Sequence, residues 1–537
     1  MLTDCAKLHT MDRERTPLTA RGLAVGIIGL IIITSSSMYV ALRMGALPWP
    51  TVFVTVLSMA ILGKAKNATL EEINCTHTLM SAGAMVAGGL AFTLPGLWMT
   101  DPSASLSTIT ILAISITGAV LGTVFTVIFR RTFIEKEKLP YPMGEAAYNT
   151  LIAGKEGKGA PILFTSLGAS ALFTFIRDEL GKIPSVLGLY GGSSLFPSLS
   201  IWVSPMALGI GAIIGPVLAL MWFGGAVLGY FIITPIGIAT GFFESMADAD
   251  AFRSNLGIGL MIGTGLGVAV KAVISLIKRK KSEKASPIPR NVIAAIVLVC
   301  ILAVIILALT TEITILEGIL LIVGVYLTTY LSGMLTGQTG VNPMEVFAIL
   351  VLLGISAVLS PSLAAAFSIA GVVAVACGLT GDVMNDLKSG SLVGTKPRYQ
   401  IMAEGIGGII GAVVAAFALI VLKDSMGGFG SPELPAPQAA AVAAMAGGLT
   451  DSVAFFIGLA AGLLLYLLKV PSATLGLGVY LPTYISSAMA LGAVIMAITK
   501  KAAKNKEKAD ENAALISSGL LGGEGITGVI IAIVSMF

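Results

Sequence analysis

The chain has 537 residues, of which 56% are hydrophobic and only 12% are charged. Soluble domains carry about 25% charged residues, so this composition excludes a soluble globular fold, a disordered chain and a disulfide-rich secreted scaffold. The net charge of +4 gives no reason to expect nucleic acid as a partner. Long apolar runs recur along the whole sequence, which predicts an integral membrane protein.

In chain order, residues 1–17 are polar, and we expect them to form a cytoplasmic segment before the first span. Several of the apolar runs that follow are shorter than the roughly 20 residues that a crossing needs, so 224–243 and 434–449 are candidates for re-entrant or broken helices. We predict an all-α polytopic fold with about 14–17 transmembrane or re-entrant helices. The runs lie near 18–42, 48–63, 73–98, 106–129, 160–176, 200–222, 224–243, 254–277, 291–311, 315–333, 344–360, 363–380, 399–422, 434–449, 451–468, 483–499 and 512–535.

Basic clusters predict which loops face the cytoplasm. The clusters begin at Arg130, Lys278, Lys388 and Lys500. The number of spans between them places the N-terminus in the cytoplasm. The side of the C-terminus depends on whether 434–449 crosses fully.

Two short motifs each recur 295 residues later, which favours a duplicated architecture. Gly45 to Pro48 matches Gly340 to Pro343, and Leu139 to Pro142 matches Leu434 to Pro437. We therefore predict a first transmembrane half at 18–277, a basic cytoplasmic linker at 278–290 and a second half at 291–537. Internal repeats with broken helices are common in secondary transporters.

Polar residues beside proline and glycine indicate unwound backbone that lines a cavity, because such residues are costly at membrane depth. The first cluster runs from Leu139 to Asn149, where Glu145 and Asn149 share one face of a new helix and offer a carboxylate for a proton or an amine. The alternative is that Glu145 only favours the helix dipole at the cytoplasmic surface.

The second cluster contains Gln338, Asn342 and Glu345 between two apolar runs, with no basic residue nearby. We interpret it as part of a binding site, although a plain turn capped by Asn342 fits the same pattern.

The third cluster runs from Asp382 to Glu404 and is either a site or an ordinary cytoplasmic loop. Asp382 and Asp386 share a helical face, Arg398 suits bidentate pairing with a carboxylate, and Gln400 follows.

The fourth cluster, around Gln438, repeats the proline motif of the first cluster but has no carboxylate at the position of Glu145. It is either part of a second, asymmetric site or a simple proline-rich turn.

The sequence lacks the usual marks of other functions. It holds only His9 and His77, so we expect no metal site, and His77 is more simply a hydrogen-bonding side chain in a pore or between helices. A Walker A motif is absent, which argues against ATP-driven transport within this chain. The motifs of intramembrane proteases and a channel-like filter repeat are also absent, so we expect neither an enzyme nor a channel.

At these clusters the chain resembles the oligopeptide transporter (OPT) family, whose yellow-stripe-like plant relatives carry metal chelates. The longest match runs from Asp382 to Gln400, and the matches together extend from about residue 20 to 530. The chain departs from the pattern of many bacterial relatives at Asn149, where they have a glutamate. The shorter matches are Ser81 to Gly83, Phe92 to Pro95, Leu139 to Gly144, Asn342 to Met344, Gly478 to Pro482, which includes Tyr480, and Gly519 to Gly525, which includes Glu524.

The resemblance implies a secondary transporter in a prokaryotic plasma membrane that takes up oligopeptides or peptide-like compounds with protons and needs no cofactor. Glu145, Glu345 and Glu524 are the candidate coupling residues, and Tyr480 joins the candidate substrate contacts. Uptake of a metal–chelate complex by the same fold stays open, as does coupling to Na⁺. By analogy with the family, a homodimer in the lipid bilayer is plausible.

Overall fold

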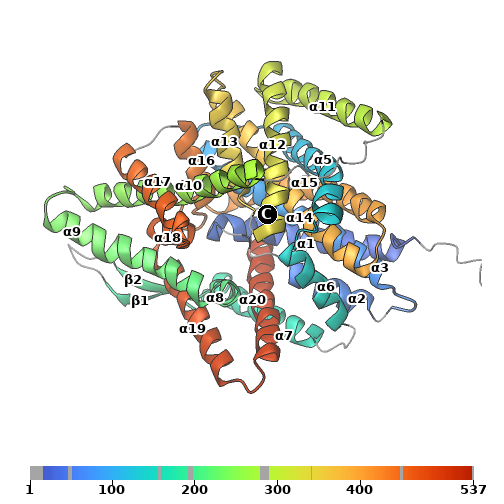
Figure 1. Ribbon diagram of the computed structural model, residues 1–537. Coiled ribbons are helices and arrows are strands. Elements are labelled where there is room, and N and C mark those ends of the chain that lie inside the picture. Colours follow the sequence, from blue (N-terminus) through green and yellow to red (C-terminus); the bar gives the residue numbers. More distant parts are fainter. Residues whose placement is uncertain are drawn as a thin grey trace, which may run out of the picture.

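The computed structural model describes residues 16–534 except 46, 48–50, 64, 155–158, 192–197, 279–289, 340–341 and 448–450, so most of the predicted linker lies outside the described residues. Within the described part the chain is almost entirely helical, as predicted (Figure 1). Its first half contains α1 (Ala20–Met44), α2 (Thr51–Leu62), α3 (Leu70–Ala91), α4 (Pro95–Thr100), α5 (Thr108–Arg130), η1 (Arg131–Lys136), α6 (Pro142–Gly154), α7 (Gly159–Asp178), β1 (Val186–Tyr190), β2 (Leu199–Trp202), α8 (Pro205–Ala226), η2 (Val227–Ile233), α9 (Thr234–Ala239) and α10 (Met246–Lys278).

The second half is helical throughout its described residues. It contains α11 (Arg290–Thr310), α12 (Ile315–Thr339), α13 (Met344–Ser356), α14 (Leu363–Val393), α15 (Pro397–Ser425), α16 (Pro437–Gly447), α17 (Ser452–Leu467), α18 (Ser472–Tyr480), α19 (Thr483–Ala502) and α20 (Lys506–Val534).

Nine helices in the described part of the chain are long and apolar enough to cross a membrane, and two shorter apolar helices accompany them. The predicted run 434–449 contains α16, which has only 11 residues and is too short for a full crossing. The predicted runs 200–222 and 224–243 are one helical stretch, broken at Gly215, whose φ of 82° a non-glycine residue rarely adopts. The hairpin of β1 and β2 was not predicted, because β1 is a short apolar stretch outside the predicted spans and β2 overlaps the start of the predicted run 200–222.

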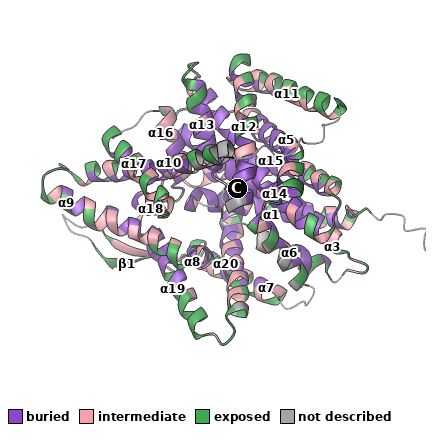
Figure 2. Cartoon of the chain, in the orientation of Figure 1, coloured by how far each residue is buried: buried purple, intermediate pink, exposed green. Residues whose placement is uncertain are grey.

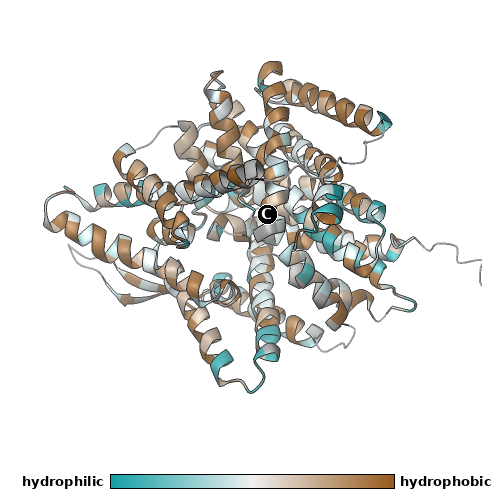
Figure 3. Cartoon of the chain, in the orientation of Figure 1, coloured by the Kyte–Doolittle hydropathy of each residue, from teal (hydrophilic) through white to brown (hydrophobic). Residues whose placement is uncertain are grey.

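Among the spanning helices in the described part of the chain, the most apolar one, α11, lies at the edge, and α3, one of the two most polar, lies at the centre. The most apolar 18-residue stretch of α3 is completely buried, whereas only 11% of that of α11 is buried. Figure 2 shows buried residues around α14 and α15, and Figure 3 shows α11 as a strongly hydrophobic helix at the rim. Lipid chains are as apolar as leucine side chains and offer no hydrogen bonds. Polar side chains therefore lie inside the protein, where neighbouring helices provide hydrogen-bond partners.

Glycines let the central helices approach until their backbones touch. A Cβ on Gly89 of α3 would lie 2.6 Å from the backbone nitrogen and Cα of Val375 in α14, and one on Gly122 of α5 would lie 2.6 Å from the carbonyl oxygen of Ala376. Small residues at such crossings are typical of helices that pack inside membranes. Here they fix α14 between α3 and α5.

Replacement of Gly89 by alanine therefore tests this packing. Overpacking of a tight core typically costs about 1–3 kcal/mol, so Gly89→Ala is expected to lower the thermal melting temperature of the purified protein. Gly405→Ala is the matched control, since a Cβ there has nothing within 4 Å. Equal melting temperatures for the two variants would contradict the packing described here.

Candidate functional site

The site is built on a helical hairpin formed by α14 and α15. Helix α14 ends at Gly394, whose φ of 95° closes the helix in the left-handed conformation that glycine favours. Helix α15 begins directly afterwards with Pro397 at its first position, where proline needs no hydrogen-bond donor. The short turn brings the last three turns of α14 against the start of α15, so residues of the third predicted cluster face each other.

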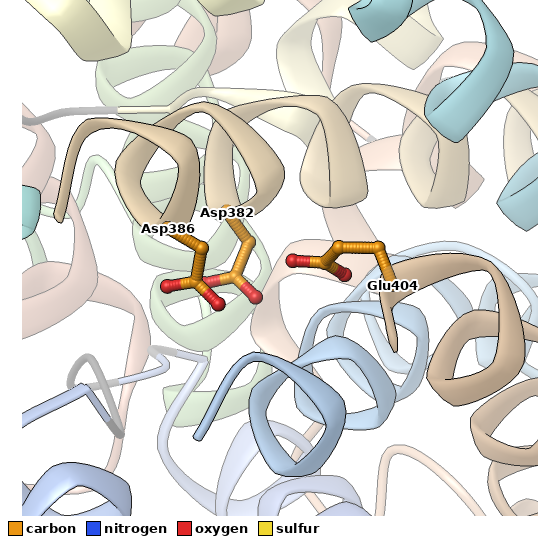
Figure 4. Close-up of side chains that lie close together, drawn as sticks. All are labelled: Asp382, Asp386 and Glu404. Atoms are coloured by element: carbon orange, nitrogen blue, oxygen red, sulfur yellow. The ribbon is translucent and has the colours of Figure 1, made fainter. Parts of the chain in front are cut away.

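Three buried carboxylic acids meet across this hairpin, and we call them the acidic cluster: Asp382, Asp386 and Glu404 (Figure 4). One carboxylate oxygen from each lies within 4.8 Å of the others. Asp382 and Asp386 come from one face of α14, as their spacing predicts, and Glu404 points toward them from α15. Each of the three side chains is at most 1% exposed.

Helix α3 closes the cluster with His77 and Ser81. The Nδ1 atom of His77 lies 3.8 Å from Oδ1 of Asp386, and Ser81 Oγ donates to Oδ2 of Asp386 at 3.0 Å. His77 is completely buried, and neither of its ring nitrogens has a hydrogen-bond partner among the described residues. The same holds for both carboxylate oxygens of Asp382 and of Glu404.

The acidic cluster is therefore short of positive charge. Within the described chain no lysine or arginine forms an ion pair with it, and His77 is the nearest basic group. Burial of an unpaired carboxylate is strongly unfavourable, and like charges at this distance repel. The three carboxylates cannot all stay ionised unless a cation balances them, and a proton lowers their total charge. The arrangement therefore suits the reversible binding of a proton or another cation.

Polar side chains connect the acidic cluster to the turn between α14 and α15. Thr395 Oγ1 accepts from Asn74 Nδ2 at 3.4 Å, and Asn74 Oδ1 accepts from Ser389 Oγ at 3.0 Å. Gln400 Nε2 donates to the carbonyl oxygen of Asp386 at 2.6 Å. All four side chains are buried, so they form a polar layer between the cluster and the turn that joins α14 to α15.

Glu145 lies outside the acidic cluster. Its side chain is 50% exposed and lies 3.5 Å from the ammonium of Lys388, at the start of α6. This position matches the alternative in which Glu145 favours the helix dipole. The side chains of Asn149 and Gln338 lie outside the described residues, and Arg398 is exposed and contacts Tyr399.

Asn342 holds the backbone of α14 one turn before Asp382. Its Nδ2 donates to the carbonyl oxygens of Cys377 at 2.8 Å and Gly378 at 3.3 Å, while its Oδ1 accepts from Ser332. The structure thus links the second predicted cluster to the third through backbone contacts. Glu345 lies half-buried in the first turn of α13.

The remaining candidates form separate contacts. Glu524 of α20 is buried and accepts from Arg177 Nη2 at 2.9 Å, Ser204 Oγ at 2.8 Å and the backbone nitrogen of Met206 at 2.8 Å. It therefore belongs to a satisfied ion-pair network at the start of α8. Gln438 donates to the carbonyl oxygen of Gly45 at 2.9 Å, and the carbonyl oxygen of Tyr480 accepts from Arg253 at 3.2 Å.

Sequence reasoning named Asp382, Asp386 and Gln400 as site residues, placed Glu404 at the end of the same cluster without giving it a role, and left His77 out of the site. A signal for Glu404 was present, because it is the one carboxylate inside the apolar run 399–422 and lies one helical turn after Gln400. His77 gave no such signal, since its approach to Asp386 depends on how α3 packs against α14.

The two completely buried glutamates are expected to respond in opposite ways to replacement by glutamine. Glu524→Gln removes the charge that pairs with Arg177. A hydrogen bond to a charged group contributes about 1.5–3 kcal/mol, so this variant should have a lower thermal melting temperature. Glu404→Gln removes one acid from a cluster without a counter-charge, so its melting temperature should stay equal or rise. A fall in melting temperature for Glu404→Gln as large as that for Glu524→Gln would show that the cluster is already compensated.

Comparison with known proteins agrees with this architecture. The family model described as OPT oligopeptide transporter protein matches residues 17–279 and again 269–535. A Haemophilus influenzae protein, whose name gives oligopeptide transport as a provisional assignment, is 26% identical over 597 aligned residues, covering 93% of this chain and 92% of the relative. With the membrane-spanning helices described above, these matches identify the chain as an integral membrane protein that belongs to the OPT oligopeptide transporter family.

Proposed function

We propose that this protein is a secondary active transporter that takes up oligopeptides across a prokaryotic plasma membrane together with protons. Membership of the family supports a carrier rather than an intramembrane enzyme, and the name of the Haemophilus influenzae relative supports peptides as the substrate class. ATP hydrolysis by this chain is not supported as the energy source, because the sequence contains no Walker A motif.

The observation that carries the coupling proposal is the acidic cluster. Asp382, Asp386 and Glu404 are buried, and His77 is the one basic side chain that the described residues place beside them. A proton is the smallest cation that relieves this repulsion, and it needs no fixed coordination geometry. The polar layer of Asn74, Ser389 and Gln400 supports an exit for that proton toward the cytoplasm.

The proposed cycle follows from the position of the cluster between three tightly packed helices. When the cluster is protonated it is neutral, and α3, α14 and α15 can move against each other without exposing a buried charge to lipid. When it is ionised, its repulsion is relieved only by contact with water or a cation. Proton binding from outside and release inside would then bias which side of the carrier is open.

Uptake of a peptide pool into proteoliposomes, with and without an inward proton gradient, tests this function. We expect gradient-dependent accumulation by the unmodified protein. Asp386→Asn should reduce that accumulation by more than tenfold while leaving peptide exchange at zero gradient intact, because the neutral side chain no longer carries a proton. Glu145→Gln is the matched control and should accumulate peptide normally.

The same assay separates the alternatives. Gradient-driven entry of a ferric or nickel chelate, without peptide uptake, would replace the substrate class and keep the coupling mechanism. Accumulation that follows a sodium gradient and ignores the proton gradient would contradict proton coupling.

A further inference from the structure

Arg43 is a half-buried arginine in the last turn of α1, and it forms no ion pair with a carboxylate among the described residues. Its guanidinium carbon lies 4.6 Å from the ring centroid of Trp202 in β2 and 5.4 Å from that of Tyr39. Its Nη1 donates to the hydroxyl of Tyr39 at 2.6 Å. Both rings are nearly completely buried, so they hold the guanidinium in one place by cation–π contacts.

Three other arginines on the described helices each form an ion pair with an acid. Arg177 pairs with Glu524, Arg253 with Asp250 at 2.9 Å, and Arg21 with Glu72 at 2.6 Å. No described acid forms an ion pair with Arg43. The charge of Glu524 reaches Arg43, but that carboxylate is already hydrogen-bonded to Arg177.

The helix end explains only part of this arrangement. A cation in the last turn of α1 favours the helix dipole, and the aromatic rings add cation–π energy. Neither interaction occupies the fork of the guanidinium, which carries five N–H donors, of which one is used within the described residues. A planar fork held against aromatic rings and lacking a counter-ion is well suited to a carboxylate, which it binds with two parallel hydrogen bonds.

Arg43 lies toward the opposite membrane face from the cytoplasmic turn. Gly83 of α3 packs against Thr34 of α1, close to the level of Ser81 and the acidic cluster. From Thr34 to Arg43 the helix rises by about 14 Å at 1.5 Å per residue. Gln438, one of the sequence candidates, lies beside this end of α1 through its hydrogen bond to Gly45.

We propose that Arg43 binds the C-terminal carboxylate of the transported peptide, with Trp202 and Tyr39 fixing the orientation of its guanidinium. This assignment rests on the proposed peptide substrate. It makes Arg43 a specificity determinant that is separate from the acidic cluster. Peptides with a free C-terminus would be preferred, while the side chains of the peptide would matter less.

Two tetrapeptide pools test the assignment, one with free C-terminal carboxylates and the other with the same sequences amidated. Initial uptake rates at low concentration are measured in proteoliposomes for the unmodified protein, Arg43→Gln and Arg43→Lys. We expect the unmodified protein to prefer the free pool by about tenfold, the size of one charge-assisted contact. Arg43→Gln should bring that preference close to one, without lowering uptake of the amidated pool. Arg43→Lys should retain part of the preference, because it keeps the charge but loses the fork.

The possible outcomes distinguish a failure of the role proposed for Arg43 from a failure of the proposed peptide transport. Uptake of neither pool by the unmodified protein would overturn the peptide proposal and this assignment together. Equal uptake of both pools, or an unchanged preference in Arg43→Gln, would overturn the role of Arg43 alone. Arg290→Gln is the control, since Arg290 is exposed at the start of α11 and should keep the full preference. Uptake of the amidated pool also reports whether Arg43→Gln is folded.

Discussion

The structure depends on one constraint: charge buried inside a membrane protein must be balanced where it lies. Glu524 meets this constraint with Arg177 and two further hydrogen-bond donors. The acidic cluster does not, because Asp382, Asp386 and Glu404 are as deeply buried and, among the residues that the structure describes, have His77 as their one basic neighbour. A buried site that is incomplete without a cation is suited to binding and releasing one, whereas a complete ion pair is suited to holding helices together.

The helices around the acidic cluster explain how so polar a centre is stable. Glycines at the crossings of α3, α5 and α14 bring the backbones into contact, so the polar side chains are enclosed by protein on every side. The most apolar spanning helix of the described chain, α11, lies at the outside, where lipid is the expected neighbour. Polar side chains on the most deeply buried spanning helices, α3 and α14, are therefore the natural place to look for function.

Much of this organisation could be predicted from the sequence. Composition and run lengths predicted an all-α membrane protein, and the four-residue spacing of Asp382 and Asp386 predicted their shared face. The hairpin of β1 and β2 could not be predicted, because its strands have only five and four residues and β2 leads directly into the apolar run 200–222. The distinction between Glu145, half-exposed beside Lys388, and Glu404, completely buried, also needed the fold, since both follow a proline-led helix start. Contacts between distant segments, such as His77 with Asp386, are set by tertiary packing.

The reversal potential of transport is the most direct test of the central claim that the acidic cluster carries the driving proton. Peptide-loaded proteoliposomes are held at a series of membrane voltages and pH gradients, and the voltage at which net peptide flux stops is recorded. The account predicts that this voltage shifts with the pH gradient for the unmodified protein and stays constant for Asp386→Asn. A reversal voltage that does not depend on the pH gradient in the unmodified protein would contradict it.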